Sequence, residues 1–246
     1  MDDGQATLRE ANAGPVRIEP RGPADAGLVE WETLDPATLE AGTPVQRGHL
    51  YDEDAADGYL VGVWEATAFD DRAGPYPVDE YMLLLEGTVV IAMPDGTEVR
   101  IDAGEAFVIP KGLRCQWKMP GTVRKIFMIL GASAGTAGAN PSLARVTKPP
   151  ISGLGRTGDG AVSMAHTAFL SADGRMAVTR TDYPDAIEAG ETSVRHRLVS
   201  VLAGAVEIDG ARFGAGETAY LRAGARGRWR VAAGTRLIEA SFAPGV

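Results

Sequence analysis

An internal repeat of short apolar segments constrains the fold of this chain more than any other feature. Residues 86–91 (EGTVVI) align with residues 203–208 (AGAVEI), and the alignment resumes after a shorter hairpin. There it pairs Ala103-Gly104-Glu105 with Ala215-Gly216-Glu217, and Trp117 with Trp229. Tryptophans and turn glycines that recur in register predict two copies of one β-fold.

The repeated segments have the length and spacing of β-strands. They include YLVGVWEA, EYMLLLEGTVVIAM, EAFVIP, RCQWKM and VRKIFMIL, and turn signals such as PDG and AGE separate them. Short strands at such intervals predict an all-β sandwich or barrel. Helical periodicity is scarce, and its best candidate is DPATLEAG near residue 35.

Composition suggests the boundaries of the two units. Residues 131–160 are rich in Gly and Pro and have little apolar patterning, which is typical of a linker or a crossing segment. We therefore predict four parts: a disordered N-terminus at 1–14, a first barrel with its preceding strands at 15–135, a Gly/Pro-rich linker at 136–160 and a degenerate second barrel at 161–246.

Charge and cysteine content limit the partners. The net charge is −9 with no long basic run, so nucleic acid and anionic membrane surfaces would be repelled, and a small ligand fits better. The apolar runs are also too short to span a bilayer. Cys115 is the single cysteine, and the acidic start lacks the features of a secretory signal, so we expect a cytoplasmic protein without disulfides.

Two spaced motifs carry a family resemblance. Glu80 and Gly87 reproduce the Glu-x6-Gly part of the first cupin motif, and the second motif, with Cys in place of its His, is reproduced by Gly104, Pro110, Gly112 and Cys115. Residues 60–130 resemble the ureidoglycine-aminohydrolase-like and ethanolamine-utilisation-like cupins, many of which have no assigned activity. Residues 165–243 resemble a cupin more weakly. The resemblance implies two tandem jelly-roll barrels, a bicupin, whose interior can line a ligand cavity, and it implies a homodimer.

The resemblance does not carry over a metal site. The two histidines that would precede Glu80 fall on Ala73, Gly74, Pro75 or Tyr76. Glu80 and Cys115 alone fall short of three protein ligands, so we predict neither a metal nor another cofactor. The three histidines are scattered along the chain, and the simplest interpretation places them on surface loops: His49, His166 and His196.

The second repeat has lost the same positions. Arg197 stands where Glu80 does, Arg222 replaces the proline and Gly227 replaces Cys115. The second barrel is then either a structural partner or an anion-binding pocket built on Arg197, because a buried guanidinium needs a partner.

Alternation along the strands points to Glu80 as the candidate catalytic residue. It places Glu80 and Met82 on one face, and Cys115 and Trp117 on one face of a neighbouring strand. A carboxylate that faces apolar side chains is a general acid or base, or the counter-charge of a cationic ligand. The alternative is an internal ion pair with Lys111 or Arg124.

Five further residues are candidate ligand-binding groups: Trp64, Tyr76, Met82, Cys115 and Trp117. Each has a simpler alternative, since the tryptophans can be core packing, Tyr76 can cap the rim and Cys115 can be an inert buried thiol. The predicted function is the binding of a small polar metabolite, amine- or carbonyl-bearing, without metal.

This prediction leaves open whether the protein is an enzyme. A cofactor-free isomerase or lyase reaction would extend it. The alternatives are a metal-dependent hydrolase or lyase similar to ureidoglycine aminohydrolase, and a non-catalytic structural or regulatory dimer.

Overall fold

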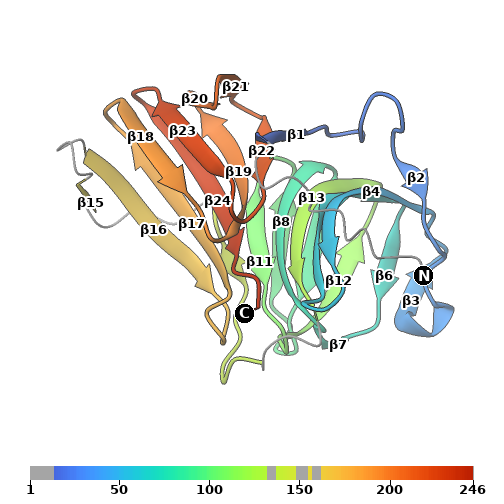
Figure 1. The fold of residues 1–246 in the computed structure, drawn as a ribbon. Helices are drawn as coiled ribbons and strands as arrows, with labels where there is room; N and C mark the ends of the chain where they lie inside the picture. Colours follow the sequence, from blue (N-terminus) through green and yellow to red (C-terminus); the bar gives the residue numbers. More distant parts are fainter. Residues whose placement is uncertain (1–13, 132–136, 148–154, 157–161, 246) are drawn as a thin grey trace, which may run out of the picture.

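The protein is built almost entirely of antiparallel β-strands (Figure 1). The computed structural model describes residues 14–131, 137–147, 155–156 and 162–245. Within these residues the one helix is the short 3₁₀ turn η1 (Pro36–Thr38), which Asp35 caps through its side chain. It lies where the sequence predicted helical character. The predicted all-β class is confirmed, and the predicted disordered N-terminus lies outside the described residues except for Gly14.

The first barrel has two sheets. A seven-stranded sheet has the order β14-β11-β8-β13-β5-β4-β2, and a second sheet has the order β10-β9-β12-β6-β3, with β7 paired to β12. The bounds of these strands are β2 (Val29–Glu30), β3 (Leu39–Gly42), β4 (Gln46–Asp54), β5 (Tyr59–Ala66), β6 (Phe69–Asp71), β7 (Gly74–Pro75), β8 (Asp79–Glu86), β9 (Thr88–Ala92), β10 (Glu98–Asp102), β11 (Ala106–Ile109), β12 (Arg114–Met119), β13 (Val123–Leu130) and β14 (Ala144–Arg145).

The second barrel repeats this plan with fewer strands. Its larger sheet has the order β1-β22-β19-β24-β17-β16-β15, and its smaller sheet has the order β18-β23-β20-β21. The bounds of these strands are β1 (Val16–Ile18), β15 (Gly155–Arg156), β16 (Val162–Leu170), β17 (Met176–Tyr183), β18 (Ile187–Thr192), β19 (His196–Ala203), β20 (Ala205–Ile208), β21 (Ala211–Gly214), β22 (Thr218–Leu221), β23 (Arg226–Val231) and β24 (Thr235–Phe242).

The strands follow the repeat found in the sequence. The hairpin β8–β9 corresponds to β19–β20, and the pair β12–β13 corresponds to β23–β24. Each of the two hairpins turns on a glycine with positive φ, Gly87 at +83° and Gly204 at +74°. A side chain at either glycine would also meet the facing backbone, which explains why both turns use this residue. The prediction of two tandem jelly-roll barrels is confirmed.

Two short edge strands come from parts of the chain outside the barrel whose sheet they extend. Strand β1, near the start of the chain, pairs with β22 of the second barrel through Val16–Ile18 and residues 218–220. Strand β14, inside the predicted linker, pairs with β11 of the first barrel, and Arg145 forms an ion pair with Glu105. The predicted domain boundaries remain a prediction. Strand β1, from the segment predicted to precede the first barrel, extends a sheet of the second barrel, and strand β14, from the predicted linker, extends a sheet of the first.

Three apolar cores lie between the four sheets. One core fills the first barrel and a second core fills the second barrel. The third lies between the two seven-stranded sheets and draws side chains from both barrels, among them Tyr59, Tyr81 and Phe242. Figure 1 shows these two sheets facing each other in the middle of the molecule. The packing of one sheet on the other excludes water from the shared face and fixes the first barrel against the second.

A polar network is buried at the edge of this shared layer. The Tyr220 hydroxyl donates to Asp52 Oδ2 (2.7 Å), and it lies 2.6 Å from His196 Nδ1 and 3.3 Å from the Tyr59 hydroxyl. Arg222 Nε donates to the same Asp52 oxygen at 3.0 Å.

The prediction that the three histidines lie on surface loops is wrong. His49 and His166 lie inside strands β4 and β16 and are half-buried. His196 begins strand β19 and is largely buried beside aromatic rings. Burial lowers the pKa of His196.

The described residues include no helix that is long and apolar enough to cross a membrane.

The network predicts a measurable cost for losing one hydroxyl. Tyr220→Phe keeps the ring but leaves Asp52 and His196 without the group that joins them. We expect the free energy of unfolding to fall by about 1–3 kcal/mol in chemical denaturation. In Tyr51→Phe the lost hydroxyl bonds only the Glu19 backbone, so a smaller loss is expected. Equal losses in the two variants would contradict the network.

Candidate functional site

The interior of the first barrel contains a cavity of about 700 Å³. Its walls combine aromatic and aliphatic side chains with a few polar groups, which is the composition expected of a small-molecule site. The apolar lining includes Trp31, Leu60, Trp64, Phe69, Trp117, Phe127 and Ile129, and the polar lining includes Gln46, Asp71, Arg72, Tyr76, Glu80, Cys115 and Lys125.

A buried ion pair lies at the centre of this lining. Lys125 on β13 donates from Nζ to Glu80 Oε1 on β8 at 2.8 Å, and their side chains are 8% and 5% exposed. The Tyr76 hydroxyl donates a short hydrogen bond to the other oxygen, Glu80 Oε2. Burying two charges is costly unless they are paired and hydrogen-bonded. Here both carboxylate oxygens have a donor, so the pair is largely compensated within the protein.

The ammonium group of Lys125 also contacts two aromatic rings and a thioether sulfur. It lies 4.7 Å from the ring centroid of Trp64 and 4.8 Å from that of Trp117, so two aromatic faces bind it. Met82 Sδ lies 3.3 Å from Nζ. Trp64 is itself fixed, because its Nε1 donates to the side chain of Gln46 at 2.9 Å. Lys125 is therefore a positioned cation rather than a flexible chain.

Asp71 supplies a second acidic group in the same cavity. Its Oδ1 accepts a hydrogen bond of 2.6 Å from the backbone N–H of Trp117. Burial, together with the neighbouring charge of Asp70, raises the pKa of Asp71 to about 6, despite that hydrogen bond. A carboxyl group with this pKa exchanges its proton near neutral pH, which is the property expected of a general acid or base.

Tyr76 and Cys115 stay protonated in this environment. Burial and the charge of Glu80 raise the pKa of Tyr76 well above its usual value, so its hydroxyl acts as a donor. Burial and the charge of Asp71 raise the pKa of Cys115 to about 11. The thiolate is the reactive form of cysteine, and Cys115 remains a thiol at neutral pH. It therefore lines the cavity and does not act as a nucleophile.

Five of the six predicted site residues line the cavity together: Trp64, Tyr76, Glu80, Cys115 and Trp117. Met82 is fully buried behind Lys125 and is not among the lining residues. The structure thus brings the predicted residues to one place, while their roles remain predictions.

The sequence interpretation missed Lys125. It named Lys111 or Arg124 as the internal partner of Glu80, and both assignments are wrong. Arg124 pairs instead with Glu65 and Glu86. The alternation of VRKIFMIL carried the signal, because it places Lys125 on the same face as Phe127 and Ile129, which line the cavity.

The donor set of the cavity does not suit the metal that a cupin fold implies. No three His, Cys, Asp or Glu side chains in the described ranges lie close enough together to hold an ion. Both oxygens of Glu80 already accept hydrogen bonds, and the Cys115 thiol stays protonated at neutral pH. The cation that faces Glu80 is the ammonium of Lys125.

The second barrel carries a similar unit with the charges exchanged. Arg197, at the position of Glu80 in the repeat, forms an ion pair with Glu239 at 2.5 Å. Its guanidinium lies 4.4 Å from the ring centroid of Trp229, the counterpart of Trp117. Because Arg197 is bound to Glu239 and stacked on Trp229, the geometry favours the structural role over an anion site.

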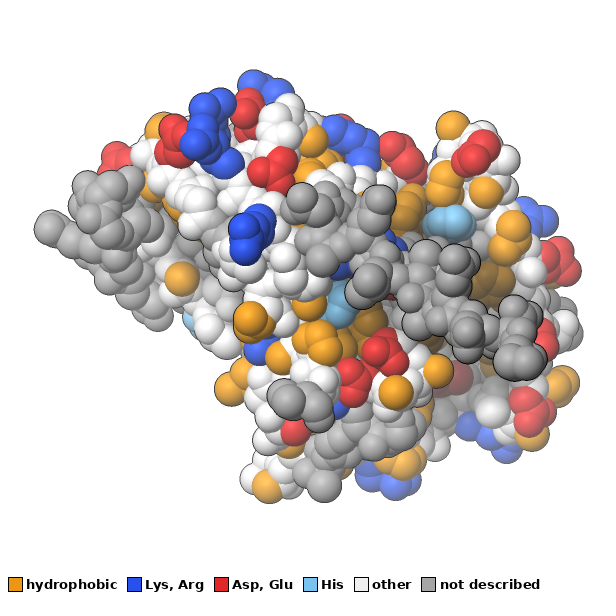
Figure 2. Space-filling view, viewed as in Figure 1, with side chains coloured by type: hydrophobic (Ala, Val, Ile, Leu, Met, Phe, Trp, Pro, Cys, Tyr) orange, Lys and Arg blue, Asp and Glu red, His pale blue; other side chains and the backbone are white. Residues whose placement is uncertain are grey.

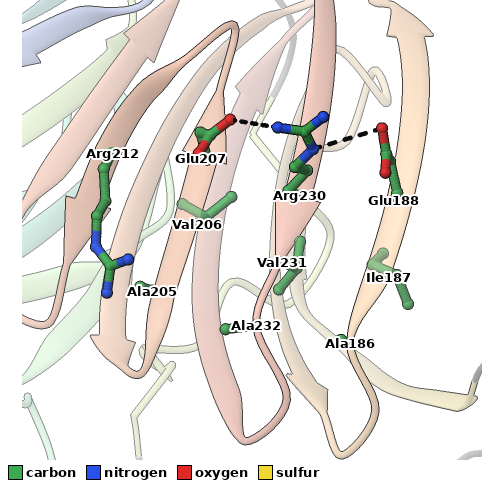
Figure 3. A pocket seen from close by; sticks show the side chains of 10 residues that line it. All are labelled: Ala186, Ile187, Glu188, Ala205, Val206, Glu207, Arg212, Arg230, Val231 and Ala232. Atoms are coloured by element: carbon green, nitrogen blue, oxygen red, sulfur yellow. Dashed lines mark hydrogen bonds and ion pairs between the residues drawn. The ribbon is translucent and has the colours of Figure 1, made fainter.

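A second hollow, of about 450 Å³, lies on the smaller sheet of the second barrel (Figure 3). Arg230 lies there between Glu207 and Glu188, at 3.1 Å and 3.5 Å. These side chains are about half exposed, so water screens their charges. Figure 2 shows the same pattern on the surface, where Lys and Arg side chains lie beside Asp and Glu side chains at this end of the molecule. The hollow lacks the buried charges of the first cavity.

Comparison with known proteins agrees with the geometry. Residues 54–127 match the EutQ-like cupin domain, and this segment includes Trp64, Glu80, Trp117 and Lys125. This segment of the chain is similar to a cupin domain. The match falls within the first barrel and confirms the resemblance to ethanolamine-utilisation-like cupins. None of the curated proteins searched matches the chain.

Several solved structures share the fold at low sequence identity. A Pseudomonas syringae pv. tomato protein of unknown function is 16% identical, with a TM-score of 0.65 over 93% of this chain and 99% of that one. Protein Ylba from E. coli is 13% identical, with a TM-score of 0.55 over 99% and 96%. A cupin 2 conserved barrel domain protein from Leptotrichia buccalis is 12% identical, with a TM-score of 0.54 over 88% and 98%. At these identities the likeness concerns the fold alone.

The buried ion pair predicts a non-additive effect on stability. Lys125→Met leaves the Glu80 carboxylate buried without its cation, and we expect a loss of about 3 kcal/mol in the free energy of unfolding. Adding Glu80→Gln removes the stranded charge, so the double variant should regain at least half of that loss. Lys118→Met, in an exposed pair with Glu98, is the control and should leave stability nearly unchanged, because water screens that pair. Additive losses would contradict the pairing.

The raised pKa of Asp71 predicts a pH-dependent stability. Its folded-state pKa of about 6 exceeds the usual 3.8, so the folded state holds the proton more tightly. Stability is therefore lost as the pH rises through this interval. Because the group is partly solvated, we expect Asp71→Asn to gain only about 1 kcal/mol above pH 7 and little at pH 4. Glu98→Gln, at an exposed carboxylate, is the control, and an equal gain of Asp71→Asn at both pH values would contradict the shift.

Proposed function

We propose that the first barrel binds a small polar metabolite without a metal ion, and that a carbonyl oxygen of this ligand faces Lys125. One observation carries the proposal, namely the Tyr76–Glu80–Lys125 unit in the wall of a 700 Å³ cavity. A cation that is fixed in an apolar cavity binds a partially negative oxygen more strongly than a water-exposed cation does.

The geometry favours a carbonyl over an amine, the other ligand class that the sequence predicted. An amine cation would be repelled by the fixed Lys125 ammonium, and both oxygens of Glu80 already bind donors from Tyr76 and Lys125. The cavity also contains a buried Trp117 Nε1 that has no hydrogen-bond partner in the described part of the chain. A polar ligand with several acceptors would satisfy such a donor.

Glu80 then has two tasks in this proposal. It holds Lys125 in place between the two tryptophans, and through Lys125 it anchors the ligand. The absence of a metal is proposed on the donor set, in which Glu80 is already saturated and Cys115 remains a thiol. A small molecule is the proposed partner, and the net charge of −9 supports it over nucleic acid or an anionic membrane. A cytoplasmic homodimer is proposed from the cysteine content and the family resemblance.

The test begins with the protein as it is purified, without chelator and without an affinity metal. Native mass spectrometry with elemental analysis should show substoichiometric metal, and an organic adduct would give the mass of the ligand. Stoichiometric metal would overturn the proposal in favour of a metal-dependent hydrolase or lyase.

A variant tests the role of Glu80 directly. Glu80→Gln keeps the shape of the side chain but removes its charge, so we expect a folded protein that binds pyruvate or the copurified adduct at least 10-fold more weakly. Circular dichroism checks the fold and native mass spectrometry measures binding. Glu98→Gln, on the exposed pair with Lys118, is the control. Undiminished binding by Glu80→Gln would contradict the proposal.

A further inference from the structure

Asp71 is the charged group of the cavity that the Tyr76–Glu80–Lys125 unit leaves out. We infer that the cavity catalyses proton transfer at a carbon next to a carbonyl group, with Asp71 as the base and the Lys125 ammonium stabilising the oxygen. This inference rests on the proposed function, because it requires a carbonyl-bearing ligand in the same cavity. It adds the reaction class and a second catalytic residue.

The placement of Asp71 is the first argument. Trp117 contacts both groups, because its backbone N–H donates to Asp71 Oδ1 and its ring lies 4.8 Å from Lys125 Nζ. Base and cation therefore contact the same residue and line the same cavity. The bond from Trp117 orients the carboxyl group, and Asp71 Oδ2 has no hydrogen-bond partner among the described residues. That oxygen can take a proton from a ligand.

The contrast with Glu80 is the second argument. Glu80 is neutralised by Lys125, and its two oxygens are occupied. Asp71 forms no ion pair among the described residues, and its pKa of about 6 keeps it ionised at neutral pH while allowing it to hold a proton. Two carboxyl groups with different environments in one cavity can take different roles, and here one fixes the cation while the other moves a proton.

The ionisable groups around Asp71 come from three segments. Asp70 precedes it on β6 and raises its pKa. Tyr76 and Cys115 are close enough that the charge of Asp71 raises their own pKa values. Arg72 follows it, lines the cavity and donates to the Leu39 carbonyl at 3.2 Å. Tyr76 and Cys115 are neutral at working pH, so Asp71 is the titrating group expected to set a pH profile near 6.

The proposed step balances without any co-reactant. Asp71 takes the proton from the carbon, the electrons of the C–H bond form a C=C bond, and the carbonyl π electrons move to the oxygen. The resulting enolate oxygen carries the negative charge that Lys125 stabilises. Return of the proton to the same carbon gives exchange or epimerisation. Where that carbon also carries a hydroxyl group, transfer of the hydroxyl proton to the enolate oxygen leaves an enediolate, and return of the proton to the former carbonyl carbon gives isomerisation. No electrons leave the substrate.

The test is isotope exchange with simple carbonyl compounds. Wild-type protein is incubated with pyruvate, hydroxyacetone or acetoacetate in D₂O, and NMR follows the loss of the protons next to the carbonyl. We expect protein-dependent exchange of at least one probe, with a rate that rises with pH through about 6. Asp71→Asn should lower this rate roughly 100-fold or more and flatten the profile. Glu98→Gln, which changes an exposed carboxylate outside the cavity, should stay within about threefold of wild type.

A second variant, Lys125→Met, tests the role of the cation. It removes the charge that stabilises the enolate oxygen and should lower the exchange rate by roughly 100-fold. No exchange above the buffer rate for all three probes would overturn the inference, and so would full exchange by Asp71→Asn. Binding of the same probes is measured by native mass spectrometry. Probes that bind to the wild-type protein without exchange would refute the inference while the proposed function stands. A stoichiometric metal in the purified protein would refute the proposed function itself.

Discussion

The ion pair between Lys125 and Glu80 is the constraint on which the first barrel depends. Two charges that are almost fully buried need complementary partners, and the barrel supplies them from four strands or their ends. Tyr76 donates to the second oxygen of Glu80, while Trp64 and Trp117 cover the ammonium. These contacts connect β8 to β13, β5 and β12. The strands that form the wall of the cavity are therefore the same strands that position the charged groups inside it.

The two barrels share a fold but differ in what their buried cations do. In the first barrel a lysine faces a cavity, whereas in the second barrel Arg197 is bound to Glu239 and stacked on Trp229. The seven-stranded sheets then pack against each other through a shared apolar layer. The second barrel thereby supports the sheet that contains both Glu80 and Lys125. A substitution in that shared layer would act on the site through the position of β8 and β13.

The sequence predicted the fold well because its signals are local and repeated. Strand alternation, turn glycines such as Gly87 and Gly204, and the Glu-x6-Gly spacing do not depend on distant contacts. The same alternation brought Trp64, Glu80, Cys115 and Trp117 to one cavity. Alternation could have placed Lys125 on the cavity face, but its pairing with Glu80 and the position of Asp71 beside Trp117 depend on which strands are neighbours in space. His196 was misplaced for the same reason, because its burial depends on Tyr59 and Tyr220 from two different strands.

The central claim is that a lysine, and not a metal, is the fixed cation of this barrel. NMR of protein with ¹³C-labelled lysine, with elemental analysis of the same sample, tests it most directly. Because aromatic rings shield groups held over their faces, the ε-methylene signal of Lys125 should lie upfield of the other lysines and vanish in Lys125→Met. Glu80→Gln should shift it back toward the others. A Lys125 signal among those of exposed lysines, or one metal ion per chain, would contradict the account.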